Sequence, residues 1–320
     1  MLAVSIAHAL LLVFSVAFAP ESSQGPSTPQ SPGPTFRSGV DLVTVSAVVR
    51  DGKGRLVREL KRDQFQVFDQ GVRRVITEFR PDQGPLTVAL LFDMSGSMSV
   101  ASKIDAAKQT AAHVIAWLQP GRDDVALFGF DTRLEELQPF STKEGNLRES
   151  LAGVEPFGMT SLYDAIAATA RRVAARGGGH RAVVVFTDGI DTSSKLTLPE
   201  VSGIASRIDV PIYILVVASS LDSPGLQASL VPTRAEMPTG NLANLAVWTG
   251  GELFVCTSGQ PAEASLAARQ VVEELRHQYL IAFEPGSQPG WHPIEVRMRN
   301  KKLTVRARSG YFAAQPRLGS

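Results

Sequence analysis

The chain has one cysteine, Cys256, among its 320 residues. This excludes an intramolecular disulfide framework, a cysteine-based zinc cluster and a CxxC redox pair. The chain also lacks an excess of charge of either sign, because 32 Lys and Arg residues offset 31 Asp and Glu residues to a formal net charge of +1. Such a chain has no global basic field that would attract nucleic acid. With 44% hydrophobic residues, it is too apolar to be disordered and long enough for two packed cores.

Residues 2–19 contain no charged side chain and end in Ala17-Phe18-Ala19, a small-x-small pattern that precedes signal peptidase cleavage. We therefore expect a signal peptide over residues 1–19 and a protein exported to the periplasm or the cell exterior. The segment has no Lys or Arg before its apolar run, and Pro20 follows the cleavage pattern directly, which are atypical features of a signal. An uncleaved anchor in the inner membrane remains an alternative, since about 20 apolar residues span a bilayer.

Residues 20–38 are rich in Pro, Ser, Gly and Gln and poor in aliphatic side chains. Such a segment buries too little surface to offset its ordering entropy, so we expect an extended linker. Strand patterns follow in residues 39–83, where DLVTVSAVVR leads into turns at 51–54 and 69–71, and again in residues 278–313. Neither stretch has enough strands to be stable alone. We predict that the two pair into one small β-sandwich-like domain, with 314–320 as a tail.

Residues 84–277 alternate between strand-like and helix-like runs. The strand-like runs are 86–93, 125–130, 182–188 and 211–217, and the helical runs lie near 101–118, 160–176, 197–207 and 261–277. This alternation, with solid Val, Leu and Ile runs, predicts an α/β fold with a mostly parallel, Rossmann-like central sheet covered on both faces. Ser161 and Asp164 have the spacing of a capping box at the start of one helix.

Polar side chains follow three of these segments at one edge of the sheet, where ligands bind in open parallel sheets. Asp93, Ser95 and Ser97 lie directly after the strand TVALLF, Thr160 precedes a helix, and Asp188 ends the strand AVVVFTD. Two carboxylates and three hydroxyls suit a hard divalent cation such as Mg²⁺, which takes about six oxygen ligands. Two Asp charges neutralise the cation and leave one position for an outside acidic oxygen.

The sequence DMSGS, with Thr160 and Asp188, resembles the metal-ion-dependent adhesion site of von Willebrand factor type A domains. The flanking sequences resemble the bacterial VWFA-related family often found in acidobacteria. The resemblance covers most of residues 84–277, and all five metal positions match. It implies a Rossmann-like domain, Mg²⁺ or Mn²⁺ at the five residues, and protein ligands rather than catalysis.

Two other interpretations fit some of these residues. Asp93, Ser95 and Thr160 could each cap a helix, a role that Ser, Thr and Asp often fill, although all five residues at matching strand ends favour a metal site. A metal with an open position could also activate water, which would make the protein a hydrolase. That chemistry needs a base within reach, and the sequence singles out none: it has no HExxH, P-loop, GxSxG or GxGxxG pattern. We therefore expect no enzymatic activity.

The expected partner is a protein that offers Asp or Glu to the metal. Residues 218–240 form a long connection, and such connections are often functional. We expect this loop and 189–197 to border the site and select the ligand. The alternative is a structural component of a cell-envelope complex, with a metal that only stabilises the fold. A run of basic residues near the C-terminus is expected to be a solvated sheet face rather than a nucleic-acid surface: Arg297, Arg299, Lys301, Lys302, Arg306 and Arg308.

Overall fold

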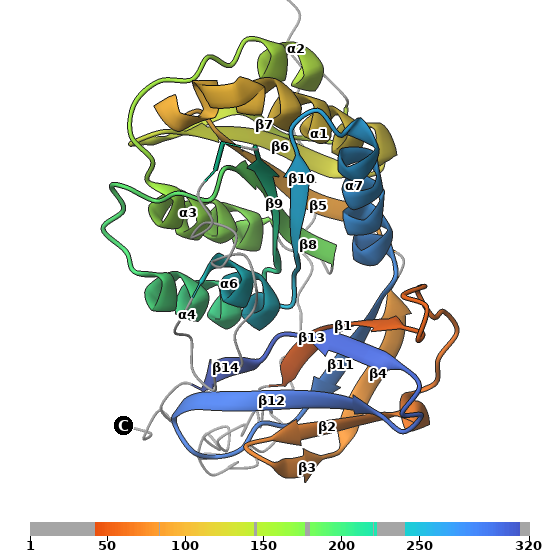
Figure 1. The fold of residues 1–320 in the computed structure, drawn as a ribbon. Helices are drawn as coiled ribbons and strands as arrows, with labels where there is room; N and C mark the ends of the chain where they lie inside the picture. Colours follow the sequence, from red (N-terminus) through yellow and green to blue (C-terminus); the bar gives the residue numbers. More distant parts are fainter. Residues whose placement is uncertain are drawn as a thin grey trace, which may run out of the picture. The chain divides into compact units, whose positions relative to one another are not determined.

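The computed structural model describes residues 42–82, 84–143, 146–176, 180–219, 221–222 and 241–313, which belong to one compact unit (Figure 1). The signal or anchor at 1–19, the linker at 20–38 and the tail at 314–320 lie outside these described residues, as does most of the connection 218–240. Within the described ranges, no helix has the length and apolar character needed to cross a membrane.

A six-stranded sheet forms the centre of the α/β part, in the order β10-β9-β8-β5-β6-β7. Its strands are β5 (Leu86–Asp93), β6 (Asp124–Phe130), β7 (Leu134–Ser141), β8 (His180–Thr187), β9 (Ile212–Ala218) and β10 (Leu253–Thr257). All neighbours are parallel except β7, which runs antiparallel to β6 at the edge. The sequence did not predict β7, because its apolar pattern is weak and it contains Pro139, a residue that strands tolerate at a sheet edge.

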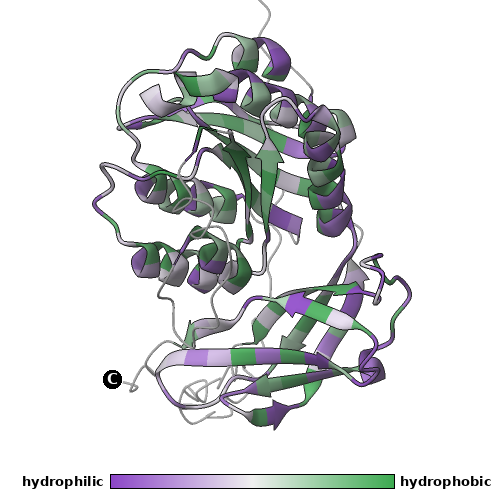
Figure 2. Ribbon diagram, viewed as in Figure 1, coloured by the Kyte–Doolittle hydropathy of each residue, from purple (hydrophilic) through white to green (hydrophobic). Residues whose placement is uncertain are grey.

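Helices cover both faces of this sheet, as the strand-helix alternation predicted. They are α1 (Lys103–Trp117), α2 (Leu147–Ala152), α3 (Leu162–Ala175), α4 (Leu198–Ile208), α6 (Leu242–Thr249) and α7 (Pro261–Arg276), with 3-10 turns at Arg62–Gln64 and Gly96–Ser102. On β5, Leu90 and Phe92 face the core under α1 and α7, whereas Ala89 and Leu91 face the core under α3 and α4. Both faces of the parallel strands are therefore apolar, and Figure 2 shows most of their length in green.

Strands from both flanks of the chain form two four-stranded antiparallel sheets. One has the order β13-β1-β11-β4 and the other β14-β12-β2-β3, and their side chains share one apolar core. The strands are β1 (Val43–Arg50), β2 (Phe65–Asp69), β3 (Val72–Arg74), β4 (Ile76–Asp82), β11 (Gln278–Phe283), β12 (Gly290–Met298), β13 (Thr304–Ala307) and β14 (Gly310–Ala313). The predicted fold class, a mostly parallel α/β sheet with an antiparallel β part built from both flanks, is confirmed.

A buried ionic network joins α7 to the antiparallel part. Glu274 is fully buried and accepts hydrogen bonds from Arg50 of β1 and Arg306 of β13, while Arg306 also pairs with Glu252. Arg308 is buried as well and donates to the backbone carbonyl groups of Ser206 and Thr44. The expectation of a solvated face is therefore wrong for Arg306 and Arg308, because both side chains turn inward and find acceptors within the protein.

Candidate metal site

Asp93 and Ser95 lie at the carboxyl end of β5 and are both buried. The Asp93 carboxylate accepts hydrogen bonds from the Ser95 backbone N–H (2.9 Å) and from the Thr187 hydroxyl (2.5 Å), at the end of the neighbouring strand β8. The Ser95 and Ser97 hydroxyls are 3.1 Å apart. Burial, opposed by these hydrogen bonds and reinforced by the charge of Asp188, raises the pKa of Asp93 to about 6. These contacts place four of the five predicted residues in one cluster.

The position of this cluster follows from the topology. Strands β5 and β8 are adjacent and parallel, but the chain after β5 continues into α1 on one face and the chain after β8 into α4 on the other. The connections therefore diverge and leave a crevice at the carboxyl ends of the two strands, where α/β sheets bind ligands. Asp93 and Asp188 are the residues at that point.

Asp188 is fully buried and pairs with Lys103, a residue that the sequence pattern does not single out. The Lys103 ammonium lies 3.3 Å from Asp188 Oδ2 and 2.6 Å from Asp222 Oδ1, and the Lys103 side chain is only 4% exposed. Burial opposes the charge of Lys103, but hydrogen bonding to Asp222 and the charges of both carboxylates together raise its pKa. Lys103 thus compensates one carboxylate of the site and ties it to the chain that follows β9.

Thr160 follows a segment that is held to the cluster by backbone hydrogen bonds. The Gly96 N–H donates to the Gly158 carbonyl (3.0 Å), and the Phe157 N–H donates to the Met94 carbonyl (2.6 Å), so the segment before Thr160 is bonded to the DMSGS turn. Thr160 itself is 3% exposed. Among the described residues, its hydroxyl makes no hydrogen bond to the other four predicted ligands, so its role at the site stays a prediction.

The start of α3 differs from the predicted capping box. Ser161 makes no side-chain capping bond, and the Asp164 carboxylate instead accepts from the backbone N–H groups of Lys195 and Leu196. The cap comes from another segment: Asp191 accepts from the Leu162 N–H at 2.8 Å. Asp191, 29 positions after Leu162, thus replaces the local cap. Its hydrogen bond links the loop after Asp188 to the N-terminus of α3.

The donor set fits a divalent cation. Asp93 and Asp188 are both fully buried, and the charge of Asp188 is near enough to raise the pKa of Asp93. Lys103 supplies one positive charge against these two carboxylates. Burying a carboxylate without a full counter-charge is costly, so a cation is favoured at this point. The described residues contain no group of three or more His, Cys, Asp and Glu side chains arranged for a metal. A site here therefore depends on hydroxyl and water ligands, as Mg²⁺ allows.

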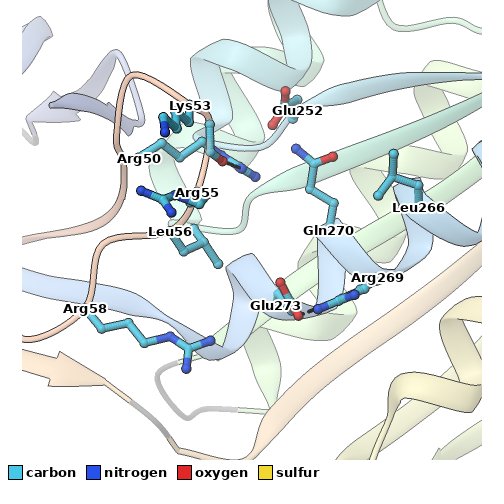
Figure 3. A pocket seen from close by; sticks show the side chains of 11 residues that line it. Arg50, Lys53, Arg55, Leu56, Arg58, Glu252, Leu266, Arg269, Gln270 and Glu273 are labelled. Atoms are coloured by element: carbon cyan, nitrogen blue, oxygen red, sulfur yellow. Dashed lines mark hydrogen bonds and ion pairs between the residues drawn. The ribbon is translucent and has the colours of Figure 1, made fainter. Parts of the chain in front are cut away.

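One cavity of the described part lies away from these residues. It has a volume of about 620 Å³ and lies between the turn after β1 and helix α7 (Figure 3). Arginine and lysine side chains dominate its lining, together with Glu252 and Glu273, and none of the five predicted metal residues takes part. The candidate metal site is thus defined by strand ends and loops rather than by a deep pocket.

We expect Lys103→Met to strengthen metal binding and to weaken the metal-free fold. The ammonium near Asp188 repels a divalent cation, so its loss should raise Mg²⁺ affinity about tenfold or more. Without it, the buried carboxylate of Asp188 and the partly exposed carboxylate of Asp222 lose their shared counter-charge, so the melting temperature in EDTA should fall. Thermal unfolding with and without Mg²⁺ measures both effects, with Lys108→Met on the same helix as control. Weaker Mg²⁺ binding in Lys103→Met would contradict this account.

We expect Asp191→Ala to destabilise the protein by about 1–2 kcal/mol, the range for loss of a helix N-cap. The substitution removes the acceptor of the Leu162 N–H and releases the loop after Asp188. Urea unfolding measures the effect, and Asp63→Ala, which alters an exposed carboxylate in the antiparallel part, should stay within about 0.5 kcal/mol of wild type. A loss in Asp191→Ala no larger than in this control would show that the cap is dispensable.

These features define an α/β domain with acidic and hydroxyl side chains at the crevice between the ends of two parallel strands. Residues 88–190 match the family model of the von Willebrand factor type A domain, and the chain therefore contains a domain of that family. No curated protein matches the chain.

Similar solved structures have low sequence identity. A von Willebrand factor type A protein from Catenulispora acidiphila is 12% identical, with a TM-score of 0.49 over 88% of this chain and 76% of that one. BatB from Bacteroides thetaiotaomicron is 18% identical, with a TM-score of 0.46 over 59% of this chain and 98% of that one. Proximal thread matrix protein 1 from the mussel byssus is 16% identical, with a TM-score of 0.47 over 65% of this chain and 49% of that one. That structure is described as having a zinc-occupied MIDAS motif.

Proposed function

We propose that this chain is an exported, non-enzymatic binding protein that captures an acidic side chain of a protein partner through a bound metal ion. Its ligands would be Asp93, Ser95, Ser97, Thr160 and Asp188, with Mg²⁺ or Mn²⁺ as the ion. The observation that carries the proposal is the buried pair Asp93 and Asp188 at adjacent strand ends. Domains of this family commonly bind a divalent metal and generally mediate protein–protein interaction, which supports the proposal.

The chemistry follows from charge and coordination number. When bound, the ion supplies a positive centre that attracts a carboxylate oxygen. The side chains of Asp93 and Asp188 would hold the ion, and the Ser95 and Ser97 hydroxyls would complete part of its oxygen shell. A cation with two Asp ligands retains an affinity for one more acidic oxygen. This selects Asp or Glu of a partner over a neutral amide.

The second candidate is a structural component of an envelope complex whose metal only stabilises the fold. The burial of Asp93 favours it, since a cation would remove the cost of that charge whether or not a partner binds. The two functions differ in what they expect of a partner. Capture requires the metal to contact the partner, whereas a fold-stabilising metal does not.

A competition experiment separates the two functions. The protein is immobilised and exposed to cell-envelope extract in Mg²⁺, and bound protein is released with EDTA. Capture predicts retention that free glutamate competes away and that glutamine, its uncharged analogue, leaves intact. Asp93→Ala should retain nothing. Retention that is insensitive to glutamate and EDTA would contradict capture through the metal and favour the structural function.

A further inference from the structure

We propose that an apolar rim around the metal site selects a partner segment in which the Asp or Glu is flanked by apolar side chains. This inference rests on the proposed function. The rim consists of large apolar side chains that are exposed in the described structure: Val100, Phe157, Met159, Ile190 and Leu221. Large apolar patches on the surface of a soluble protein mark interaction sites.

The rim residues lie on the loops that carry the metal-site residues. Phe157 is 80% exposed, and its backbone N–H bonds to Met94 of the DMSGS turn, while Met159 directly precedes Thr160. The Ile190 N–H bonds to the Asp188 carboxylate at 3.3 Å. These three side chains therefore project from backbone that is hydrogen-bonded to, or adjacent to, the predicted ligands.

The other two rim residues, Val100 and Leu221, lie on backbone next to Lys103 and its ion-pair partner Asp222. Val100 lies between Ser97 and α1, and its carbonyl accepts from the Lys103 backbone N–H. Leu221 is 75% exposed and adjoins Asp222, the ion-pair partner of Lys103. The other exposed large apolar side chains of the described residues lie outside the loops that carry the predicted metal residues: Leu42, Val72, Val75, Trp117, Val255 and Leu266.

The arrangement specifies the chemistry of the occupant. A metal-bound carboxylate at the centre fixes one side chain of the partner, and apolar side chains next to it would cover Phe157, Met159 and Ile190. Partly buried apolar contacts around a polar anchor exclude water and strengthen the anchor. Neighbouring residues of an extended segment lie about 3.3 Å apart, which brings side chains adjacent to the acidic residue within reach of the rim.

A peptide selection tests the proposal. A library of random peptides displayed on phage is bound to the full chain in Mg²⁺ and eluted with EDTA. Wild type should enrich peptides with Asp or Glu next to apolar residues. The double variant Phe157→Ser/Ile190→Ser should still yield EDTA-released acidic peptides but lose the apolar enrichment. A selected peptide should bind this variant about tenfold or more weakly, on the scale of a lost interface hot spot.

Two controls and three outcomes make the test decisive. Val75→Ser, which changes an exposed apolar side chain of the antiparallel part, should behave as wild type, and Asp93→Ala should yield no EDTA-released peptide. Acidic peptides without apolar neighbours from wild type would overturn the rim and leave metal capture intact. The absence of any EDTA-released acidic peptide would overturn metal capture itself. Metal-independent binding to phosphatidylcholine vesicles that the rim variant loses would assign the rim to a lipid surface and contradict the proposal.

Discussion

Replacing Asp93 with Asn should abolish Mg²⁺ and Mn²⁺ binding and at the same time stabilise the metal-free protein at pH 7.5. The carboxylate is fully buried, and its burial raises its pKa to about 6 from the ordinary value of 3.8. The folded state therefore disfavours the ionised form by about 3 kcal/mol. Asn removes the charge, so it should recover up to about that amount, less the weakened hydrogen bonds from Ser95 and Thr187.

The sign of the pH dependence follows from the raised pKa. Between about pH 6 and pH 4, folded Asp93 holds a proton that the unfolded chain has released, so this residue adds stability as the pH falls through 6. Above pH 6 the ionised Asp93 carboxylate lowers the free energy of unfolding by its full amount, so the gain in stability from Asp93→Asn is largest there. Urea unfolding in EDTA at pH 7.5 and pH 5 should show this advantage shrinking, with the exposed Asp105→Asn as control. An Asn variant less stable than wild type at pH 7.5 would contradict the assignment.

Metal binding should show the opposite pH trend. A protonated Asp93 cannot act as an anionic ligand, so the apparent Mg²⁺ affinity should fall about tenfold for each pH unit below 6. Calorimetric titration at pH 7.5 and pH 5 measures this change. A flat affinity over that interval would show that Asp93 is not a ligand.

Glu274→Ala should lower the free energy of unfolding by about 3–5 kcal/mol, the range for breaking a buried ion pair by removing one partner. Glu274 is fully buried and accepts from Arg50 and Arg306, so the substitution leaves two guanidinium groups short of an acceptor. That loss is a large fraction of the 5–15 kcal/mol by which proteins are stable. Urea unfolding of the variant measures it directly.

The neighbouring residue provides a matched control. Glu273 pairs with Arg269 one turn away on the solvent side of α7, and its side chain is 34% exposed. Surface pairs of this kind contribute at most about 1 kcal/mol, so Glu273→Ala should cause a small loss. Equal losses for Glu273→Ala and Glu274→Ala would show that the network does not hold α7 to the antiparallel part.

The sequence predicted the parallel strands and their helices because periodicity reports burial directly. Solid apolar runs such as Leu86–Asp93 have to be buried on both faces, and the strand ends then follow from where the runs stop. The same reasoning located Asp93 and Asp188, since both follow such runs. It missed β7, an edge strand that has no fully buried residue and no such pattern.

Contacts between distant segments could not be predicted. Nothing local to Lys103 indicates that its ammonium would turn inward to Asp188 and Asp222, 85 and 119 positions away, because a single lysine at the start of a helix has no distinguishing pattern. The cap of α3 shows the same limit. Ser161 and Asp164 had the right spacing, but Asp191 came closer to the helix N-terminus through the fold of another loop.

The most direct test of the central claim is a calorimetric titration of the chelator-stripped protein with Mg²⁺ and Mn²⁺, beside Asp93→Ala. The account predicts saturable binding of one ion by wild type and no binding by the variant. Glutamate is added in a parallel titration, because a carboxylate can complete the coordination shell and strengthen the complex. Failure of wild type to bind either ion, with or without glutamate, would contradict the metal site and reduce the DMSGS segment to a helix-capping turn.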